Sequence, residues 1–361
     1  MQDKLIVVKV TEDCNLSCKY CYRPNGIDKS PMSETTVRNV LSKFLDHNER
    51  GIIIVWHGGE PCLAGKEFFQ KALEIENELN HKKLIINNQI QTNGTLLNED
   101  FVYFLKLTGF KVGVSFDGLP HIHNANRISR NGKGTYEGVL NGMRILKSKF
   151  GKFGTVMILT KKTLGFEKEI YCLFKDMGLN HIKINAYIPG GTGISYKDDL
   201  YLSPEEYAKS MISFYNLWIS DPTKGVEIEP LNDIVEGMFT GENISCSYSG
   251  ACVSKVLSIE PNGDVYPCGR ISDISRFKMG NINNDSIEAI LNSSIRYEIE
   301  MRSNKIKCRS TCKFFKICGG GCYYESYVHF GDVYHPTPYC MARKELFEYI
   351  HQDVRNRLGK S

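Results

Sequence analysis

Three cysteines lie within eight positions near the start of the chain, in the stretch VTEDCNLSCKYCYRP at residues 10–24. Cys14, Cys18 and Cys21 have the spacing C-x3-C-x2-C. A closed electron-transfer cluster is held by four cysteines. Three cysteines therefore predict a [4Fe–4S] cluster with one iron left open to bind a substrate or a cofactor. The alternative interpretations are a zinc site completed by a distant histidine and three unrelated buried thiols.

Most of the remaining cysteines form a second group. The chain has thirteen cysteines, and eight of them lie in residues 246–340. An odd number without a secretion signal argues against a disulfide framework. Because eight is two sets of four, we expect two more four-thiolate sites, holding either iron–sulfur clusters or structural zinc. The eight are Cys246, Cys252, Cys268, Cys308, Cys312, Cys318, Cys322 and Cys340.

Two cysteines lie outside both groups. Cys172 is on the apolar face of a predicted helix, and we expect it in the core. Cys62 directly follows the sequence GGEP at 58–61. We interpret it as a buried bystander, with a position near the reacting groups as the alternative.

The first group of cysteines must be positioned by the surrounding fold, for which the sequence predicts a regular alternation of strands and helices. Apolar runs predict strands over 5–11, 52–57, 84–92, 111–117, 153–160 and 181–186. Helical spacing predicts helices over 33–48, 65–80, 98–107, 135–149, 166–177 and 203–219. Six such repeats predict an α/β fold with a parallel sheet and outer helices, curved into a partial (β/α)6 barrel. Apolar runs without alternation predict strands covered on both faces.

The pattern changes after about residue 225. Residues 241–340 are rich in Gly, Cys and short loops, which indicates a segment organised by metal sites. A last helix is predicted over 341–358. We therefore expect two domains, 1–225 and 226–361.

The composition describes an ordinary globular protein, with 42% hydrophobic and 24% charged residues. No apolar run is long enough for a membrane span, and the N-terminus does not resemble a signal peptide. We therefore expect a cytoplasmic enzyme. The net charge of +4 gives little support for a nucleic-acid partner.

With Tyr20, the first motif becomes C-x3-C-x-Y-C, and HGGEP follows at 57–61. This combination resembles the radical S-adenosylmethionine (SAM) enzymes. The resemblance implies that SAM binds the open iron and is cleaved to a 5′-deoxyadenosyl radical. It also implies that the glycine-rich edge meets the SAM amino group, because glycine lets a ligand approach the backbone. Asp117 fits a plain turn. The residues implied to bind the cofactor are Tyr20, Gly58, Gly59, Glu60, Ser115 and Arg127.

The second group resembles the SPASM domain, a two-cluster extension of some radical SAM enzymes. Cys252 leads to Gly263 and to GDVYPC, and CRSTCKFFKICGGGC follows. The first pair in this run is C-x3-C where the family has C-x2-C, which widens a loop but keeps the number of ligands. The resemblance implies one auxiliary cluster on Cys246, Cys252, Cys268 and Cys322. It implies another, and so three [4Fe–4S] clusters in all, on Cys308, Cys312, Cys318 and Cys340.

SPASM enzymes mostly modify peptides or proteins, and the layout is similar to anaerobic sulfatase-maturating enzymes and to maturases of ribosomal peptides (RiPPs). In the sulfatase-maturating enzymes, an aspartate after the G-x4-C cysteine is the expected base. Here that position is Gly269, followed by Arg270. We therefore expect a maturase that forms a C–C, C–S or C–O cross-link within a precursor peptide. The alternative is oxidation of Cys or Ser to formylglycine, for which Asp273 or Glu325 would have to act as the base.

The resemblance also implies partners. These are an electron donor such as flavodoxin or ferredoxin, and auxiliary clusters that exchange an electron with the product. Because Cys14 lies close to the start of the chain, we expect a leader peptide to be held by the core or by a separate peptide-binding protein. A non-catalytic iron–sulfur electron carrier and a nucleic-acid-modifying enzyme are the other classes. The GGEP edge argues against the first, and the weak basic balance argues against the second.

Overall fold

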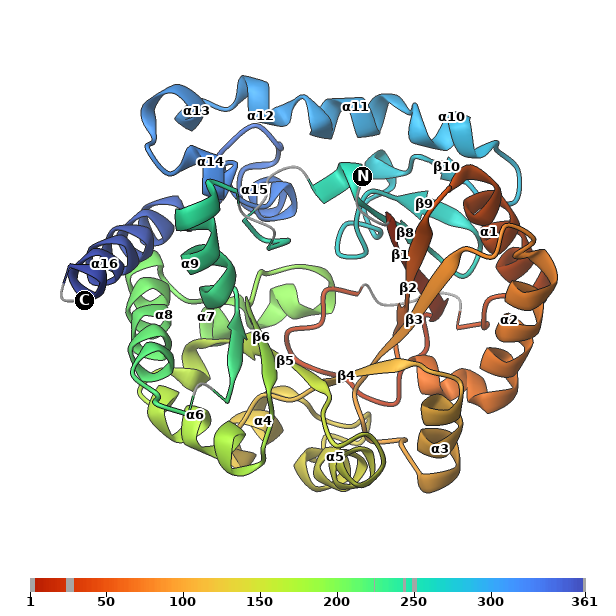
Figure 1. The fold of residues 1–361 in the computed structure, drawn as a ribbon, viewed down its shortest axis with the longest axis horizontal. Coiled ribbons are helices and arrows are strands. Elements are labelled where there is room, and N and C mark those ends of the chain that lie inside the picture. The colour runs from red at the N-terminus through yellow and green to blue at the C-terminus, as the bar shows by residue number, and fades with distance from the viewer. Residues whose placement is uncertain (1–3, 24–28, 224, 243–244, 249–251, 360–361) are drawn as a thin grey trace.

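One curved sheet organises the molecule. The computed structural model describes residues 4–23, 29–223, 225–242, 245–248 and 252–359. Within them, a ten-stranded sheet has the order β10-β9-β8-β1-β2-β3-β4-β5-β6-β7. The sheet curves into part of a barrel, and helices lie on its outer side (Figure 1). This confirms the predicted parallel α/β architecture.

The strands β1 to β7 pair in sequence order and are parallel, and β8 adds to β1 in parallel. β9 and β10 extend this edge as antiparallel strands. The first six match the predicted strands within a few residues. The strands are β1 Lys4–Thr11, β2 Gly51–Gly58, β3 Ile85–Thr92, β4 Lys111–Ser115, β5 Gly154–Leu159, β6 His181–Ala186, β7 Glu227–Glu229, β8 Val256–Ile259, β9 Asp264–Tyr266 and β10 Gly280–Asn281.

Six helices match the predicted ones. They are α1 Glu34–His47, α2 Gly65–Leu79, α3 Glu99–Leu107, α5 Tyr136–Phe150, α6 Glu167–Asp176 and α8 Pro204–Ile219. Three further helices before residue 241 are not predicted from the apolar pattern. They are α4 Pro120–Asn126, α7 Lys197–Leu200 and α9 Leu231–Thr240. None of the helices in the described residues is both long and apolar enough to cross a membrane.

Capping residues explain where several helices begin. The side chains of Ser33 and Asn98 accept hydrogen bonds from backbone N–H groups in the first turns of α1 and α3. Ser203 and Glu206 form a reciprocal capping box at α8, with Pro204 in its first turn. Each cap pairs a backbone donor that has no partner inside the helix.

Residues 241–340 contain more regular structure than the predicted loops. Besides β8, β9 and β10, they carry α10 Ile287–Leu291, α11 Ser294–Glu300, α12 Arg302–Lys305, α13 Cys308–Thr311, α14 Phe315–Cys318 and α15 Tyr323–Phe330. The strands have two to four residues, which is too short for alternation to show in the sequence. The helices α10 to α13 lie across the side where the two edges of the sheet do not meet (Figure 1). The last helix, α16 Cys340–Leu358, is confirmed and packs against α8.

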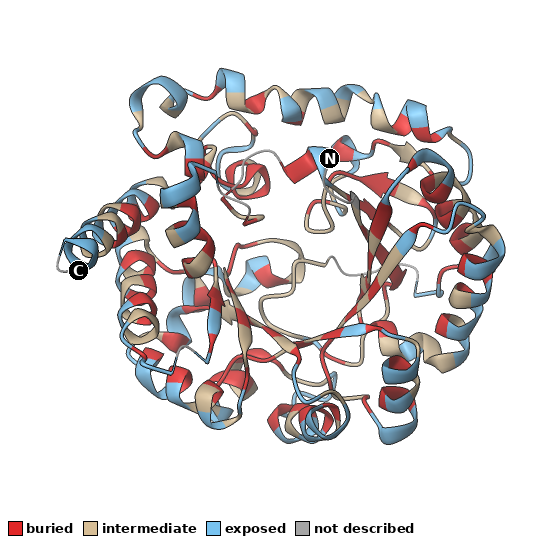
Figure 2. Ribbon diagram, in the orientation of Figure 1, coloured by how far each residue is buried: buried red, intermediate tan, exposed pale blue. Residues whose placement is uncertain are grey.

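Burial alternates along the strands. In β2, Ile52, Ile54 and Trp56 are buried, whereas Ile53 and Val55 are half-buried. Buried residues concentrate between the sheet and the helices, and many residues on the inner side are half-buried (Figure 2). The prediction that these strands are covered on both faces is therefore wrong for the inner face, because that face has no second layer of helices.

Candidate active site

The glycine-rich edge holds the loop that carries the first cysteines. The backbone N–H of Gly59 donates to the Thr11 carbonyl, and that of Glu60 donates to the Asp13 carbonyl, both at 2.8 Å. A Cβ on Gly59 would lie 2.0 Å from the Asp13 oxygen, and one on Gly58 would lie 2.3 Å from the Thr11 oxygen. Gly58 also has φ of +123°. Close approach of two backbones therefore requires both glycines.

Glu60 joins the carboxyl ends of β2 and β3. Its buried carboxylate accepts hydrogen bonds from the Thr92 hydroxyl at 2.7 Å, from the Asn93 backbone N–H at 2.7 Å and from the Cys62 backbone N–H at 3.1 Å. Burial raises the pKa of Glu60, although these hydrogen bonds favour the charged form. The side chain thus orders the strand ends beside the cysteine loop.

A buried network ties the cysteine loop to the end of β4. The Tyr20 hydroxyl donates to Asp117 Oδ2 at 2.5 Å, and Arg127 Nε lies 3.2 Å from the same oxygen. The guanidinium of Arg127 also lies over the Tyr20 ring, 5.2 Å from its centroid. Burial would lower the pKa of Arg127, but the charge of Asp117 raises it well above its usual value. Asp117, which the sequence suggests only as a turn residue, is the shared partner of two predicted site residues.

Ser115 ends β4 on the half-buried inner side, where its hydroxyl accepts a hydrogen bond from Gln91 Nε2 at 3.1 Å. The predicted cofactor residues therefore come from the segment that follows β1, from the end of β2 and the segment after it, from the end of β4 and, for Arg127, from the end of α4. Their contact with SAM stays a prediction.

The three cysteines of the first group lie close together. Burial raises the pKa of Cys14 to about 11 and that of Cys18 to about 12, and the charge of Cys21 acts on both. The backbone N–H of Leu16 donates to Cys14 Sγ at 3.4 Å, which favours the thiolate. Metal binding has to displace the protons from these buried thiols.

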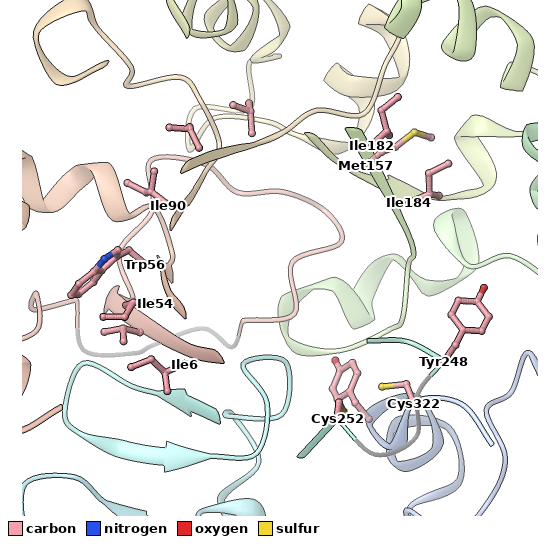
Figure 3. Close-up of a cluster of buried hydrophobic side chains, with 14 of the residues drawn as sticks. Ile6, Ile54, Trp56, Ile90, Met157, Ile182, Ile184, Tyr248, Cys252 and Cys322 are labelled. Atoms are coloured by element: carbon pink, nitrogen blue, oxygen red, sulfur yellow. The ribbon is translucent and has the colours of Figure 1, made fainter. Parts of the chain in front are cut away.

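A second set of thiols gathers from distant segments. Cys252 and Cys322 lie side by side in Figure 3. A hydrogen bond between Cys246 and Cys252 lowers the pKa of Cys246 to about 6 and raises that of Cys252 well above its usual value. The charge of Cys268 acts on both Cys252 and Cys322. These four are the predicted first auxiliary set.

The third set surrounds the CGGGC sequence at 318–322. Burial, with smaller contributions from the charges of Cys340 and Cys308, raises the pKa of Cys318 to about 11. The charge of Cys312 acts on Cys308 and Cys340. Residues 319–321 all have positive φ, a conformation that favours glycine, and the buried guanidinium of Arg302 donates to their three carbonyls. This turn separates Cys318 from Cys322, which are predicted to belong to different sets.

All thirteen cysteines are free thiols. Where a neighbouring cysteine acts on the pKa of another, both belong to the same set. Thiolates in threes and fours are the donors that iron–sulfur clusters use. In the part of the chain that the structure describes, no three Cys, His, Asp or Glu side chains are spaced to hold a single metal ion. The fit to clusters therefore rests on donor type and grouping.

The two remaining cysteines have different surroundings. Cys62 is half-buried, and its thiol lies 3.5 Å from the Thr92 hydroxyl, next to Glu60. Cys172 is exposed, so the prediction that it lies in the core is wrong. In α6, Tyr171 and Phe174 are buried instead, which shows that Cys172 flanks the apolar face.

A cavity of about 450 Å³ lies beside the cysteine loop, between β1 and the hairpin of β8 and β9. Lys9, which extends from β1, lies 3.1 Å from Glu260 and 3.4 Å from Glu12. Burial raises the pKa of Glu260 to about 7, while Lys9 acts in the opposite direction. The sequence analysis missed Lys9 and Glu260. The signal for Lys9 is one charged residue inside the apolar strand LIVVKVT.

The two residues predicted as possible bases, Asp273 and Glu325, differ in exposure and in how their carboxylates are held. Asp273 lines the cavity and is exposed, and partial loss of its hydration raises its pKa. Glu325 is buried in an ion pair with Arg343 at 2.8 Å and accepts a hydrogen bond from Thr337 at 2.5 Å. Gly269 faces the same part of the barrel as the cavity, because a Cβ there would lie 3.8 Å from Lys9 Cε.

Two models of known families match this chain, one in each predicted part. The Radical SAM superfamily model matches residues 8–170, and the SPASM model, an iron-sulfur cluster-binding domain, matches residues 251–319. The chain is 30% identical to the cysteine-type anaerobic sulfatase-maturating enzyme of Clostridium perfringens (strain 13 / Type A). That alignment covers 98% of this chain and 97% of the relative.

Comparison with solved structures supports the same family assignment. The structure of native anSMEcpe with bound AdoMet and Cp18Cys peptide matches with a TM-score of 0.89 and 27% identity, over 100% of both chains. Streptococcus suis SuiB bound to precursor peptide SuiA matches with a TM-score of 0.69 and 17% identity, over 94% of this chain and 76% of SuiB. At that identity, the second match shows a shared fold alone.

The fold, the cysteine motifs and these matches define the class: the chain belongs to the radical SAM superfamily, among the SPASM-domain enzymes related to the anaerobic sulfatase-maturating enzymes. It is an enzyme whose cofactors are [4Fe–4S] clusters and S-adenosylmethionine. The predicted family, fold class and cofactors are confirmed.

Proposed function

We propose that this enzyme oxidises a cysteine side chain of a protein substrate to formylglycine. The observation that carries the proposal is the match over 98% of the chain to a cysteine-type anaerobic sulfatase-maturating enzyme. The fold of anSMEcpe in complex with a peptide supports the same substrate class. The cross-link predicted from Gly269 has less support, because the likeness to SuiB extends to the fold alone.

In this proposal, Cys14, Cys18 and Cys21 hold the cluster whose open iron binds SAM. When bound, SAM and this cluster supply the radical that removes a hydrogen atom from the substrate. The backbone edge at Gly58 and Gly59 orients SAM. The network of Tyr20, Asp117 and Arg127, together with Ser115 and Glu60, keeps the ends of the strands in place around it.

Formation of the aldehyde also releases a proton, so a base is needed. Asp273 fits this role better than Glu325, because it is exposed at the cavity and has no ion pair among the described residues. Glu325 is held by Arg343. The remaining electron leaves through an auxiliary cluster, and a flavodoxin or ferredoxin supplies the electron that cleaves SAM. The division into domains 1–225 and 226–361 is part of the same proposal.

The test uses anaerobically reconstituted, reduced enzyme with SAM. One substrate is a synthetic peptide around the active-site cysteine of a sulfatase, and its matched control has alanine at that cysteine. We expect 5′-deoxyadenosine and a hydrazide-reactive aldehyde from the cysteine peptide and no aldehyde from the control. A product lighter by about two mass units that has no aldehyde would instead support a cross-link.

A further inference from the structure

Arg270 occupies an unusual position next to the first auxiliary set, which is Cys246, Cys252, Cys268 and Cys322. Its Nη2 donates to Cys322 Sγ at 3.3 Å, and its backbone N–H donates to Cys268 Sγ at 3.5 Å. The guanidinium lies 5.2 Å from the centroid of the buried Tyr324 ring. One residue therefore contacts two cysteines of the same set, through both side chain and backbone.

The charge of Arg270 is not matched by an ion pair with any carboxylate among the described residues. Other cations nearby are matched: Arg343 pairs with Glu325 at 2.8 Å, and Lys183 pairs with Glu229 at 2.6 Å. The groups that balance Arg270 are instead the sulfurs of the cluster ligands. Its positive charge is thus directed at the cluster site.

This placement has an electrostatic consequence. Reduction of a [4Fe–4S]²⁺ cluster to [4Fe–4S]⁺ adds one negative charge. A fixed positive charge within a few ångströms stabilises the reduced form more than the oxidised form, and the partly buried site weakens the screening by water. Hydrogen bonds to the sulfurs act in the same direction.

We propose that Arg270 raises the reduction potential of the cluster held by Cys246, Cys252, Cys268 and Cys322. This cluster is thereby set to accept an electron rather than to donate one. The direction of electron flow rests on the proposed function: the Cβ of the substrate cysteine loses a hydrogen atom to the adenosyl radical, its thiol loses a proton to the base, and one electron passes to this cluster. The thioaldehyde that results is hydrolysed by water to the aldehyde, and the sulfur leaves as hydrogen sulfide. The effect of Arg270 on the reduction potential depends only on the assignment of these four cysteines as ligands of one cluster.

The test is a redox titration of the fully loaded chain followed by electron paramagnetic resonance, without any peptide. Spectra with and without SAM separate the first cluster from the auxiliary ones, because SAM binds only the open iron. The variants are Arg270→Gln, Arg270→Met, which keeps a long side chain over Tyr324, and Arg270→Lys. The matched control is Arg276→Gln, since Arg276 is paired with Glu298 at 2.6 Å.

We expect the uncharged variants to lower the reduced-to-oxidised ratio of one auxiliary cluster at least tenfold at a fixed ambient potential, a shift of about 59 mV for one electron. Arg270→Lys should recover part of this shift, and Arg276→Gln should leave the ratio unchanged. If Arg270→Gln fails to retain iron, Arg270→Met decides the question. An unchanged midpoint in an uncharged variant with full iron, or an equal shift in Arg276→Gln, would overturn the proposal. Because no peptide is present, failure of the formylglycine assay leaves this result unaffected.

Discussion

At the scale of single residues, the proton acceptor depends on which carboxylate is free to change its charge. Asp273→Asn should lower aldehyde formation by about 10²–10⁴-fold, the usual contribution of a general base. Cleavage of SAM should continue, because Asp273 does not belong to the first cluster site. The ratio of aldehyde to 5′-deoxyadenosine measures this uncoupling. Asp46→Asn, at an exposed position on α1, is the control, and an unchanged ratio in Asp273→Asn would exclude the residue as the base.

The same residue predicts a pH dependence. The pKa of Asp273 is raised, and only its ionised form accepts a proton. Aldehyde formation by the wild-type enzyme should therefore fall as the pH decreases through this raised pKa. The aldehyde yield per SAM cleaved, measured across the acidic range, reports this change. A ratio that stays constant while SAM cleavage falls would assign the acid limb to another group.

Glu325 tests the alternative base at the same scale. Its ion pair with Arg343 is buried, so Glu325→Gln should cost about 3–5 kcal/mol of folding stability by leaving the guanidinium without its counter-charge. The aldehyde yield per folded, iron-loaded enzyme should stay close to that of the wild type. Thermal unfolding and the product assay separate the two effects. A normal melting temperature with lost aldehyde would make Glu325 the base.

At the scale of elements, the end of β2 and the cysteine loop act as one unit. Gly59→Ala would place a Cβ 2.0 Å from the Asp13 carbonyl, so the loop must move. We expect a loss of about 1–3 kcal/mol of stability and about four fewer irons, with SAM cleavage abolished. Iron analysis and 5′-deoxyadenosine formation measure the effect. Gly138→Ala, in α5 with its nearest neighbour at 3.5 Å, should retain both, and full iron in Gly59→Ala would contradict this role of the edge.

The strands and helices also show how much of the fold could be predicted from the sequence. The strands of five to eight residues and the capped helices are visible because apolar runs and caps act locally, as Ser33 and Ser203 illustrate for the caps. The strand β8 is not visible, because its four residues are specified by pairing with β1, far away in the chain. Asp117 and Lys9 were missed for the same reason: their roles depend on partners brought by other strands.

At the scale of the whole molecule, the SPASM segment is joined to the barrel through the sheet. β8 continues the sheet from β1, and the 319–321 turn separates Cys318 from Cys322, which are predicted to belong to different sets. The cysteine spacing predicts the group of Cys14, Cys18 and Cys21, whereas the division of the eight cysteines in the second group is implied only by the family resemblance, because their two sets interleave along the chain. The exposure of Cys172 and the half-buried inner face of β2 depend on the curvature of the whole sheet, which no local pattern specifies.

Loss of one auxiliary ligand should therefore affect more than one cluster. In Cys318→Ala, the predicted second auxiliary set, which contains Cys318, loses a ligand directly. The 319–321 turn also loses the metal contact at one of its ends, and this turn positions Cys322 of the first auxiliary set. Because metal binding and folding are coupled in such segments, we expect iron to fall from about twelve per chain to fewer than eight. Limited proteolysis should cut first within 241–340. SAM cleavage should persist in part, because Cys14, Cys18 and Cys21 lie on the loop held by β2, while aldehyde formation should be nearly lost.

The complementary variant removes the three N-terminal thiols instead of an auxiliary ligand. Replacement of Cys14, Cys18 and Cys21 by Ala should leave about eight irons and abolish SAM cleavage, while residues 241–340 stay resistant to protease. The two variants should therefore give opposite patterns, because the proposed function assigns the radical chemistry to one site and the stabilisation of the segment with the electron acceptor to the other two. Retained SAM cleavage in the triple variant would reject the assignment of the first set. Full aldehyde yield in Cys318→Ala would show that the auxiliary segment is not needed for the oxidation.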